Sequence, residues 1–156
     1  MSSTDSHATI PEPARKLDAL LGTWAVSGTM TMGDGAARVS GRWRFSRVAD
    51  GYGVRTALQT TIEGMGTFEE EELIGFDPSE ERIHFFSLNK FAVRDHVGGW
   101  KDDHTLYVEY NGEQQGEHCR EGMTITLAGD RMEGHVVETL AGVVVVTTAL
   151  TLVKQP

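Results

Sequence analysis

The chain consists mostly of short runs rich in β-branched and aromatic residues, separated by turn-forming pairs. After Gly22 these runs recur to the end, and no segment with helical periodicity interrupts them. Asp50-Gly51 and Asn111-Gly112 are strong hairpin signals, because both central residues of a type I′ turn need a positive φ. The pattern predicts ten strands, at residues 23–30, 37–48, 53–62, 66–76, 82–88, 91–98, 104–110, 117–127, 131–140 and 143–153.

Ten strands with such short connections should form an antiparallel meander, since parallel neighbours need crossovers of about a dozen residues or more. An open sheet would leave two unpaired edges, and closure removes both. The sequence therefore predicts an all-β fold, a closed antiparallel up-and-down β-barrel of about ten strands.

The segment before the first strand has a different character. Residues 1–10 are rich in Ser and Thr and are predicted to form a disordered tail. Pro11 and Pro13 suit a first helical turn, and Gly22 can end a helix. A short helix is expected between them, with an apolar stripe of Ala14, Leu17, Leu20 and Leu21. The predicted organisation is a tail over 1–10 and a single barrel domain over 11–156.

The charge balance limits the partners of such a barrel. The 156 residues contain 14 Lys and Arg against 23 Asp and Glu, a net charge of −9. Nucleic acids and anionic membranes attract dense positive charge, so neither is an expected partner. Met1 to Ile10 lacks the basic and apolar regions of a secretion signal, and Cys119 is the single cysteine. Both observations predict a reducing, cytoplasmic compartment.

Residues 17–24, Leu-Asp-Ala-Leu-Leu-Gly-Thr-Trp, place a G-x-W motif after the short helix. This resembles the calycin superfamily, the lipocalin and fatty-acid-binding-protein-like barrels. More narrowly, it resembles a bacterial barrel family that opens L-x-x-L-x-G-x-W and later carries a G-[FY]-D turn, here Gly75-Phe76-Asp77. The resemblance implies that Trp24 closes the barrel base under a basic residue near the chain end, where this chain offers Lys154. It also implies binding of a small apolar or amphipathic molecule, and some relatives bind haem.

Strand alternation assigns side chains to the two faces of the wall. If Asp50-Gly51 is a two-residue turn, Phe45 lies opposite Thr56, and Trp43 lies opposite Leu58. This register gathers apolar side chains on one face, which should be the interior. The predicted interior set is Val39, Trp43, Phe45, Val54, Leu58 and Ile62, and the exterior set is Arg38, Arg42, Arg44, Arg55 and Gln59.

The Gly129-Asp130 turn sets a second register that places Glu121 directly opposite Glu138. Facing like charges are destabilising. If the pair is interior, one carboxyl should have a raised pKa and hold a proton, as in acid–base catalysis. If it lies at the rim, it is solvated or bridged by Arg120 or Arg131.

Four glutamates, Glu69 to Glu72, stand in the middle of a predicted strand. Because successive side chains of a strand point to opposite faces, two of the four must face inward. If the flanking Phe68 faces inward, these two are Glu70 and Glu72. Alternatively, a bulge leaves all four in water.

The histidines show no H-x-H or H-E-x-x-H spacing, so no metal site is predicted. His118 and His135 fall on outward faces. His96 follows Asp95, whose carboxylate could bring the pKa of the imidazole close to 7. Alternatively, this part of the strand is simply exposed to solvent. His104 would face Cys119 across a tight Asn111-Gly112 turn and could activate the thiol, although a lone cysteine is usually a small buried hydrophobe.

Strand 143–153 is apolar on both faces, with Val144, Val146, Leu150 and Leu152 on one and Val143, Val145 and Val153 on the other. A barrel strand needs one apolar face. The second must be covered by the N-terminal helix or by another subunit, which predicts a homodimer through this strand.

Two functions remain open. The first is binding of a small neutral or cationic molecule without a cofactor, with contacts from Trp43, Phe45, Leu58, Phe68, Glu72, Tyr110 and Met123. Interior carboxylates argue against fatty acids. The second is a cofactor-independent enzyme for isomerisation, cyclisation or dehydration, with Glu121, Glu138, Glu70 and His96 as catalytic residues. Haem binding through His96 or His135 is an alternative that rests on the resemblance. No G-x-S-x-G, P-loop or G-x-G-x-x-G motif is present.

Overall fold

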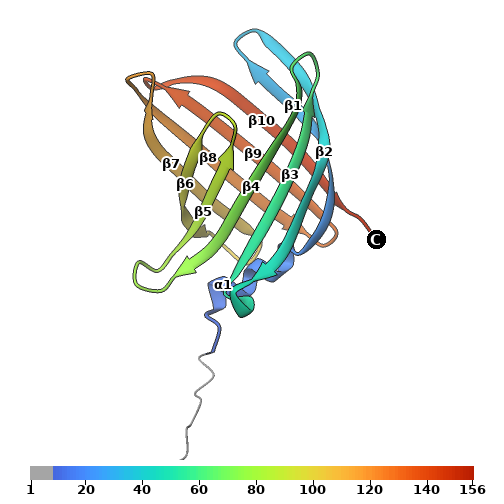
Figure 1. Ribbon diagram of the computed structural model, residues 1–156, viewed down its shortest axis with the longest axis vertical. Coiled ribbons are helices and arrows are strands. Elements are labelled where there is room, and N and C mark those ends of the chain that lie inside the picture. Colours follow the sequence, from blue (N-terminus) through green and yellow to red (C-terminus); the bar gives the residue numbers. More distant parts are fainter. Residues whose placement is uncertain (1–8) are drawn as a thin grey trace, which may run out of the picture.

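The computed structural model describes residues 9–156, so residues 1–8 of the predicted tail lie outside the described residues. Ten strands wind into a barrel above one short helical segment (Figure 1). The strands are β1 (Gly22–Met32), β2 (Gly35–Val48), β3 (Gly53–Ile62), β4 (Gly66–Asp77), β5 (Arg82–Asn89), β6 (Val93–Trp100), β7 (Thr105–Gln114), β8 (Glu117–Ala128), β9 (Arg131–Leu140) and β10 (Val143–Lys154).

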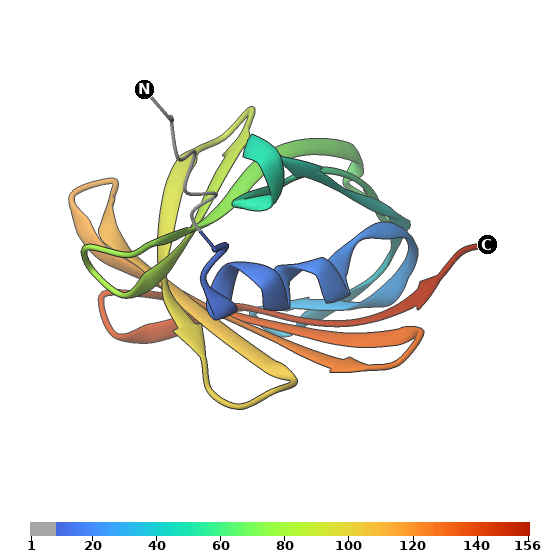
Figure 2. The same cartoon turned by 90° about the horizontal axis from the view of Figure 1, so that it is seen from below.

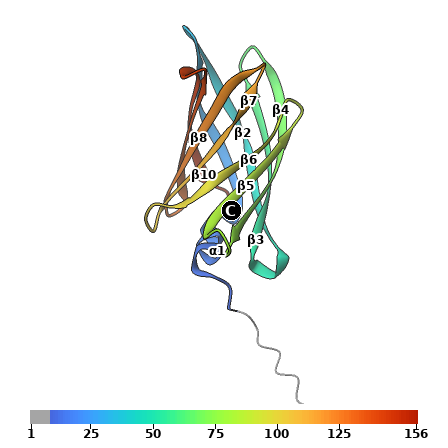
Figure 3. The same ribbon diagram turned by 90° about the vertical axis from the view of Figure 1, so that its left-hand side faces the viewer.

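The predicted closed antiparallel barrel is confirmed. Each strand pairs with its sequence neighbour, and β1 also pairs with β10, which closes the ring (Figures 1 and 3). The two predicted registers are also confirmed, because Trp43 pairs with Leu58 and Glu121 pairs with Glu138. The β2–β3 connection is longer than two residues, since a 3-10 turn, η2 (Ala49–Gly51), replaces a simple type I′ turn.

One predicted turn is wrong. Asn111 and Gly112 lie inside β7, where they pair with Arg120 and Cys119, and the β7–β8 turn lies at Gln115 and Gly116 instead. Both turn residues have positive φ, 54° and 83°, so Gln115 adopts the conformation that an asparagine was expected to supply. Cys119 therefore faces Gly112 and not His104.

The Gly98-Gly99 pair also lies within a strand, β6. The chain turns after it, at residues 101–104, where the Asp102 carboxylate accepts hydrogen bonds from the backbone N–H groups of His104 and Thr105. A side-chain acceptor thus fixes this turn, as Asp commonly does.

The lower end of the barrel is closed. The helix α1 (Glu12–Lys16) continues into a 3-10 turn, η1 (Leu17–Leu20), and both lie across the opening (Figure 2). Trp24 Nε1 donates to the Leu20 carbonyl oxygen at 2.8 Å, and Lys154 Nζ lies 5.4 Å from the centre of the Trp24 ring. The base is therefore closed as the resemblance implied, with Lys154 as the basic residue.

The N-terminal helix does not cover the outer face of β10, contrary to one expectation. A bulge between Val144 and Val146 also changes the predicted faces of this strand. Val146 pairs with Glu138 on the inner face, whereas Val144 pairs with Thr139 on the outer face. The extra residue reverses the alternation, a known effect of β-bulges that the sequence does not mark.

Candidate functional site

The interior of the barrel has two different halves. The half next to the helix is a dry hydrophobic core whose side chains are buried. It includes Trp24, Phe45, Val54, Ile74, Ile83, Phe85, Leu106, Val108, Ile125, Met132 and Leu152. No space for a ligand is expected here, because these side chains fill a barrel of this size.

Toward the other end, inward-facing side chains become half-buried and more polar. The strand pairing places these side chains on the inner face, because residues that pair across two strands point to the same side of the sheet. This upper set comprises Leu58, Phe68, Glu70, Asn89, Arg94, Tyr110, Glu121, Val136 and Glu138. Their partial exposure shows that water reaches the upper interior, which is therefore the candidate site.

Arg94 organises one wall of the upper interior. It projects from β6, and its Nη1 donates to Glu121 Oε2 on β8 at 2.7 Å and to Glu138 Oε2 on β9 at 2.9 Å. Its Nη2 donates to Gln114 Oε1 at 3.1 Å. One guanidinium thus bridges the two opposed carboxylates and, with Gln114 on β7, joins four strands.

This arrangement corrects the predicted bridge. Arg120 binds Glu109 and Arg131 binds Glu133, both on the outside of the barrel. The predicted raised pKa is also wrong for Glu121. Burial raises the pKa of this carboxyl, but the hydrogen bond from His96 and the charge of Arg94 outweigh burial and lower it overall.

His96 is an interior residue, only 3% exposed, and not a solvated one. Its Nε2 lies 2.6 Å from Glu121 Oε1, and its Nδ1 lies 3.3 Å from the Phe85 carbonyl oxygen. Glu121, and not the adjacent Asp95, is therefore its carboxylate partner. Asp95 points outward and contacts His84. Both ring nitrogens of His96 face acceptors, so the two bonds form together only in the imidazolium.

Tyr110 completes this wall from β7. Its ring centroid lies 5.9 Å from that of His96, and the Arg94 guanidinium carbon lies 5.3 Å from the Tyr110 ring. The aromatic face therefore adds a cation–π contact to the ion pairs of Arg94.

Glu70 and Glu72 both face inward from β4, as predicted, and the pairing with β3 is continuous, without a bulge. Glu72 is 4% exposed, and its Oε2 accepts hydrogen bonds from Trp43 Nε1 at 2.9 Å and from Thr56 Oγ1. Glu70 Oε2 accepts a hydrogen bond from Asn89 Nδ2 at 2.5 Å. Burial, reinforced by the neighbouring Glu70, raises the pKa of Glu72 well above its usual value. Glu72 therefore holds its proton more tightly than an ordinary glutamate does.

Cys119 is fully buried beside the Arg94 cluster. Arg94 Nη2 lies 3.9 Å from its Sγ, and burial raises the pKa of the thiol despite this neighbouring charge. The predicted activation by His104 is wrong, and Cys119 has the character of a small buried hydrophobe.

The structure brings most predicted site residues together but divides them between the two halves. Glu70, Glu121, Glu138, Leu58, Phe68 and Tyr110 are half-buried in the upper interior, whereas Trp43, Phe45, Glu72, Met123 and His96 are buried. Sequence reasoning missed Arg94, Asn89 and Thr56. Arg94 could have been found, because alternation places it on the same face as His96, two residues later.

A group of three potential metal ligands lies outside the barrel wall. Asp77, Glu80 and His84 offer ligand atoms within 4.8 Å of one another. However, His84 Nδ1 already contacts Asp95 at 3.0 Å, and its Nε2 contacts Glu80 at 3.1 Å. The hydrogen bonds within this group account for its geometry without a metal.

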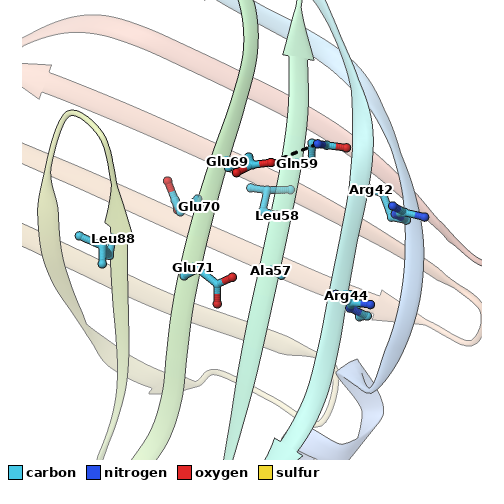
Figure 4. A pocket seen from close by; sticks show the side chains of 9 residues that line it. All are labelled: Arg42, Arg44, Ala57, Leu58, Gln59, Glu69, Glu70, Glu71 and Leu88. Atoms are coloured by element: carbon cyan, nitrogen blue, oxygen red, sulfur yellow. Dashed lines mark hydrogen bonds between the residues drawn. The ribbon is translucent and has the colours of Figure 1, made fainter.

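A hollow of about 320 Å³ lies on the wall formed by β2 to β5 (Figure 4). Most of its lining side chains point outward by register, whereas Leu58 and Glu70 belong to the upper set. The lining residues are Arg42, Arg44, Ala57, Leu58, Gln59, Glu69, Glu70, Glu71 and Leu88.

Comparison with known proteins supports the fold. No protein-family model matches the chain, and no curated protein matches it. A solved chain named EF1p2_mFAP2b, whose structure was determined bound to DFHBI, is similar to it, with 16% sequence identity and a TM-score of 0.51. The similarity covers 92% of this chain and 99% of that chain. No helix among residues 9–156 is long and apolar enough to cross a membrane. The similarity to that solved chain shows the fold alone, a closed, ten-stranded antiparallel barrel.

Proposed function

We propose that the protein binds a small, largely apolar molecule with a neutral or cationic polar group in the upper interior of the barrel. The observation that carries this proposal is the half-buried, inward-facing set of polar and apolar side chains above a dry core. The similar barrel that binds DFHBI supports small-molecule binding in general.

The charge of the upper interior favours a cation over an anion. The carboxyl groups in and directly below the upper set are Glu70, Glu72, Glu121 and Glu138, and the cationic groups are Arg94 and, when protonated, His96. Even if Glu72 is left out of this count, three carboxylates outnumber the two possible cations. A buried anionic head group would therefore meet net repulsion.

Glu138 and Glu70 are the proposed polar contacts. Both oxygens of Glu121 are already engaged, by Arg94 and by His96. Arg94 binds Glu138 through Oε2, and Asn89 binds Glu70 through Oε2. A carboxylate has about four acceptor sites, so each of these two can also accept a ligand N–H. Leu58 and Phe68 are the proposed apolar contacts.

Two dyes of opposite charge test this proposal. We expect the cationic thioflavin T to bind with one saturable site and the anionic 8-anilinonaphthalene-1-sulfonate to bind far more weakly. Glu138→Gln should weaken thioflavin T binding about tenfold, since it removes one carboxylate charge that attracts the cationic dye inside a partly buried site. Glu69→Gln is the matched control, because Glu69 lines the outer hollow. Tighter binding of the anionic dye, or an effect of Glu69→Gln alone, would overturn the proposal.

A second candidate function is cofactor-independent acid–base catalysis, and the contrast between Glu72 and Glu138 favours it. A carboxyl that holds its proton and a carboxylate that binds a cation occupy one interior, which is the usual equipment for proton transfer. In an isomerisation, a carboxylate would take a proton from carbon and a carboxylic acid would return one elsewhere. The test is conversion of 3-cyclohexen-1-one to its conjugated isomer. A bell-shaped pH–rate profile abolished by Glu138→Gln supports catalysis, and full activity in that variant removes Glu138 from the mechanism.

The geometry gives little support to haem binding. His135 is exposed on the outside, and both ring nitrogens of His96 face protein acceptors. The narrower bacterial family and the cytoplasmic compartment stay predictions, based on the L-x-x-L-x-G-x-W opening and on the free thiol of Cys119.

A further inference from the structure

The outer wall of the barrel carries a continuous apolar surface on β4, β5 and β6, which we call the outer apolar patch. It consists of Leu73, Phe86, Leu88 and Val93, which are 54%, 42%, 49% and 55% exposed. Leu73 pairs with Phe86, and Leu88 pairs with Val93, so the four side chains are cross-strand neighbours on one face. Contiguous exposed apolar side chains of this size are typical of an interaction surface.

The charges beside the patch have a specific order. Across the strands, one row of directly paired residues is Arg55 on β3, Leu73 on β4, Phe86 on β5 and Asp95 on β6. The row thus has a cation at one end, two apolar side chains in the middle and an anion at the other end. The side chains of Arg55 and Asp95 are 62% and 45% exposed, so both remain accessible.

We infer that the outer apolar patch binds a second copy of this chain, related by a two-fold axis parallel to the strands between β4 and β5. Such an axis brings Leu73 of each copy over Phe86 of the other. It also brings Arg55 of each copy toward Asp95 of the other, because the row reads in the opposite direction in the partner. A surface of this kind is self-complementary, as an isologous dimer interface must be.

The sequence predicted a dimer interface on β10, but the exposed valines of this strand form a weaker candidate interface than the outer apolar patch does. Val143 and Val144 lie at one end of the strand and Val153 at the other, about 30 Å away at 3.3 Å per residue. The outer face of β10 therefore has no continuous apolar centre, whereas the outer apolar patch has one.

This inference does not depend on the proposed ligand, because the patch faces outward and the ligand site faces inward. Sedimentation equilibrium from about 1 to about 100 µM is the test, over a range in which a homodimer of standard interface size should form. We expect a monomer–dimer equilibrium that Phe86→Glu weakens by at least about tenfold, since it buries a charge in the apolar centre. Val144→Glu is the matched control on β10 and should leave the equilibrium unchanged.

A charge exchange tests the orientation of the dimer. Arg55→Asp and Asp95→Arg should each weaken association, because each places like charges across the axis. The double variant should restore it, although the contacts of Arg55 with Glu71 and of Asp95 with His84 within one chain stay broken. Circular dichroism confirms that each variant is folded. A monomer at every concentration, dissociation caused by Val144→Glu alone, or failure of the double variant to recover would overturn the inference.

Discussion

The two halves of the barrel interior are built by the same strands with the same alternation, yet they differ in what water can reach. In the lower half the inward residues are apolar, the helix covers the opening, and the core is dry. In the upper half the same strands turn Glu70, Arg94 and Glu138 inward, and these side chains stay half-buried. The sealed core and the proposed binding site therefore lie at opposite ends of one barrel. The lower half is closed by apolar packing, while the upper half is held by polar contacts that water reaches.

Replacing one phenylalanine in each half should show the largest difference. Phe85→Ala in the lower half should lower the free energy of unfolding by about 3–5 kcal/mol, because it leaves a cavity in a packed core. Phe68→Ala in the upper half should cost about 1 kcal/mol, since Phe68 is already partly hydrated. Urea denaturation measures both. Equal losses would mean that the upper half is packed as tightly as the lower one.

Removing the charge of Arg94 should cost about 2–4 kcal/mol at neutral pH, because Glu121 and Glu138 would then face each other without a counter-ion. The loss in Arg94→Met should shrink toward pH ~4, where the two carboxyls of the variant take up protons. Arg42→Met on the outer wall should change stability by less than about 0.5 kcal/mol. If the two variants behave alike, the Arg94 cluster does not stabilise the fold.

Glu72→Gln should change how stability depends on pH. The pKa of Glu72 is raised in the folded protein, so above its usual value of 4.5 the unfolded chain releases a proton that the folded protein keeps. The stability of the wild type therefore falls as the pH rises from 4.5 through the pKa of the folded state. Glutamine stays neutral and still accepts a hydrogen bond from Trp43, so the stability of the variant should not fall in this way and should exceed that of the wild type as the pH rises above 4.5. Parallel pH profiles for the two proteins would show that Glu72 ionises normally.

The smallest expected effect lies at the sealed base. Lys154→Met should lower the free energy of unfolding by about 0.5–1 kcal/mol, because it removes the cation above Trp24. Lys154→Arg should keep the contact and the stability. Thermal unfolding followed by tryptophan fluorescence compares them, and equal stability of all three proteins would mean that the Trp24 contact contributes nothing.

The fold could be predicted from the sequence because it rests on alternation and turn chemistry, both of which are local. The register of Glu121 against Glu138 followed from the Gly129-Asp130 turn alone. The turn at Gln115 and Gly116 could not be predicted in this way, since glutamine seldom takes a positive φ and Asn111-Gly112 offered a stronger signal four residues earlier.

The site was predicted only in part, because its contacts join strands that are distant in sequence. Alternation turns Glu70, Glu121 and Glu138 inward, but nothing local indicates that Arg94 lies between the last two. Whether a carboxyl is protonated depended on such partners. Despite its burial, Glu121 has a lowered pKa because His96 and Arg94 lie beside it, whereas burial and the neighbouring Glu70 raise the pKa of Glu72.

The pairing of β1 with β10 has a consequence for how the chain reaches its native state. Every other strand pair is a hairpin that can form as soon as its second strand is available. The pair that closes the ring joins Trp24 to Lys154, the two ends of the barrel sequence, and requires the ordering of nearly the whole chain. On the ribosome, β1 must therefore wait with one edge unpaired until the last strand emerges. During that interval the nascent chain is most exposed to aggregation, and a chaperone that shields this edge would act at that stage.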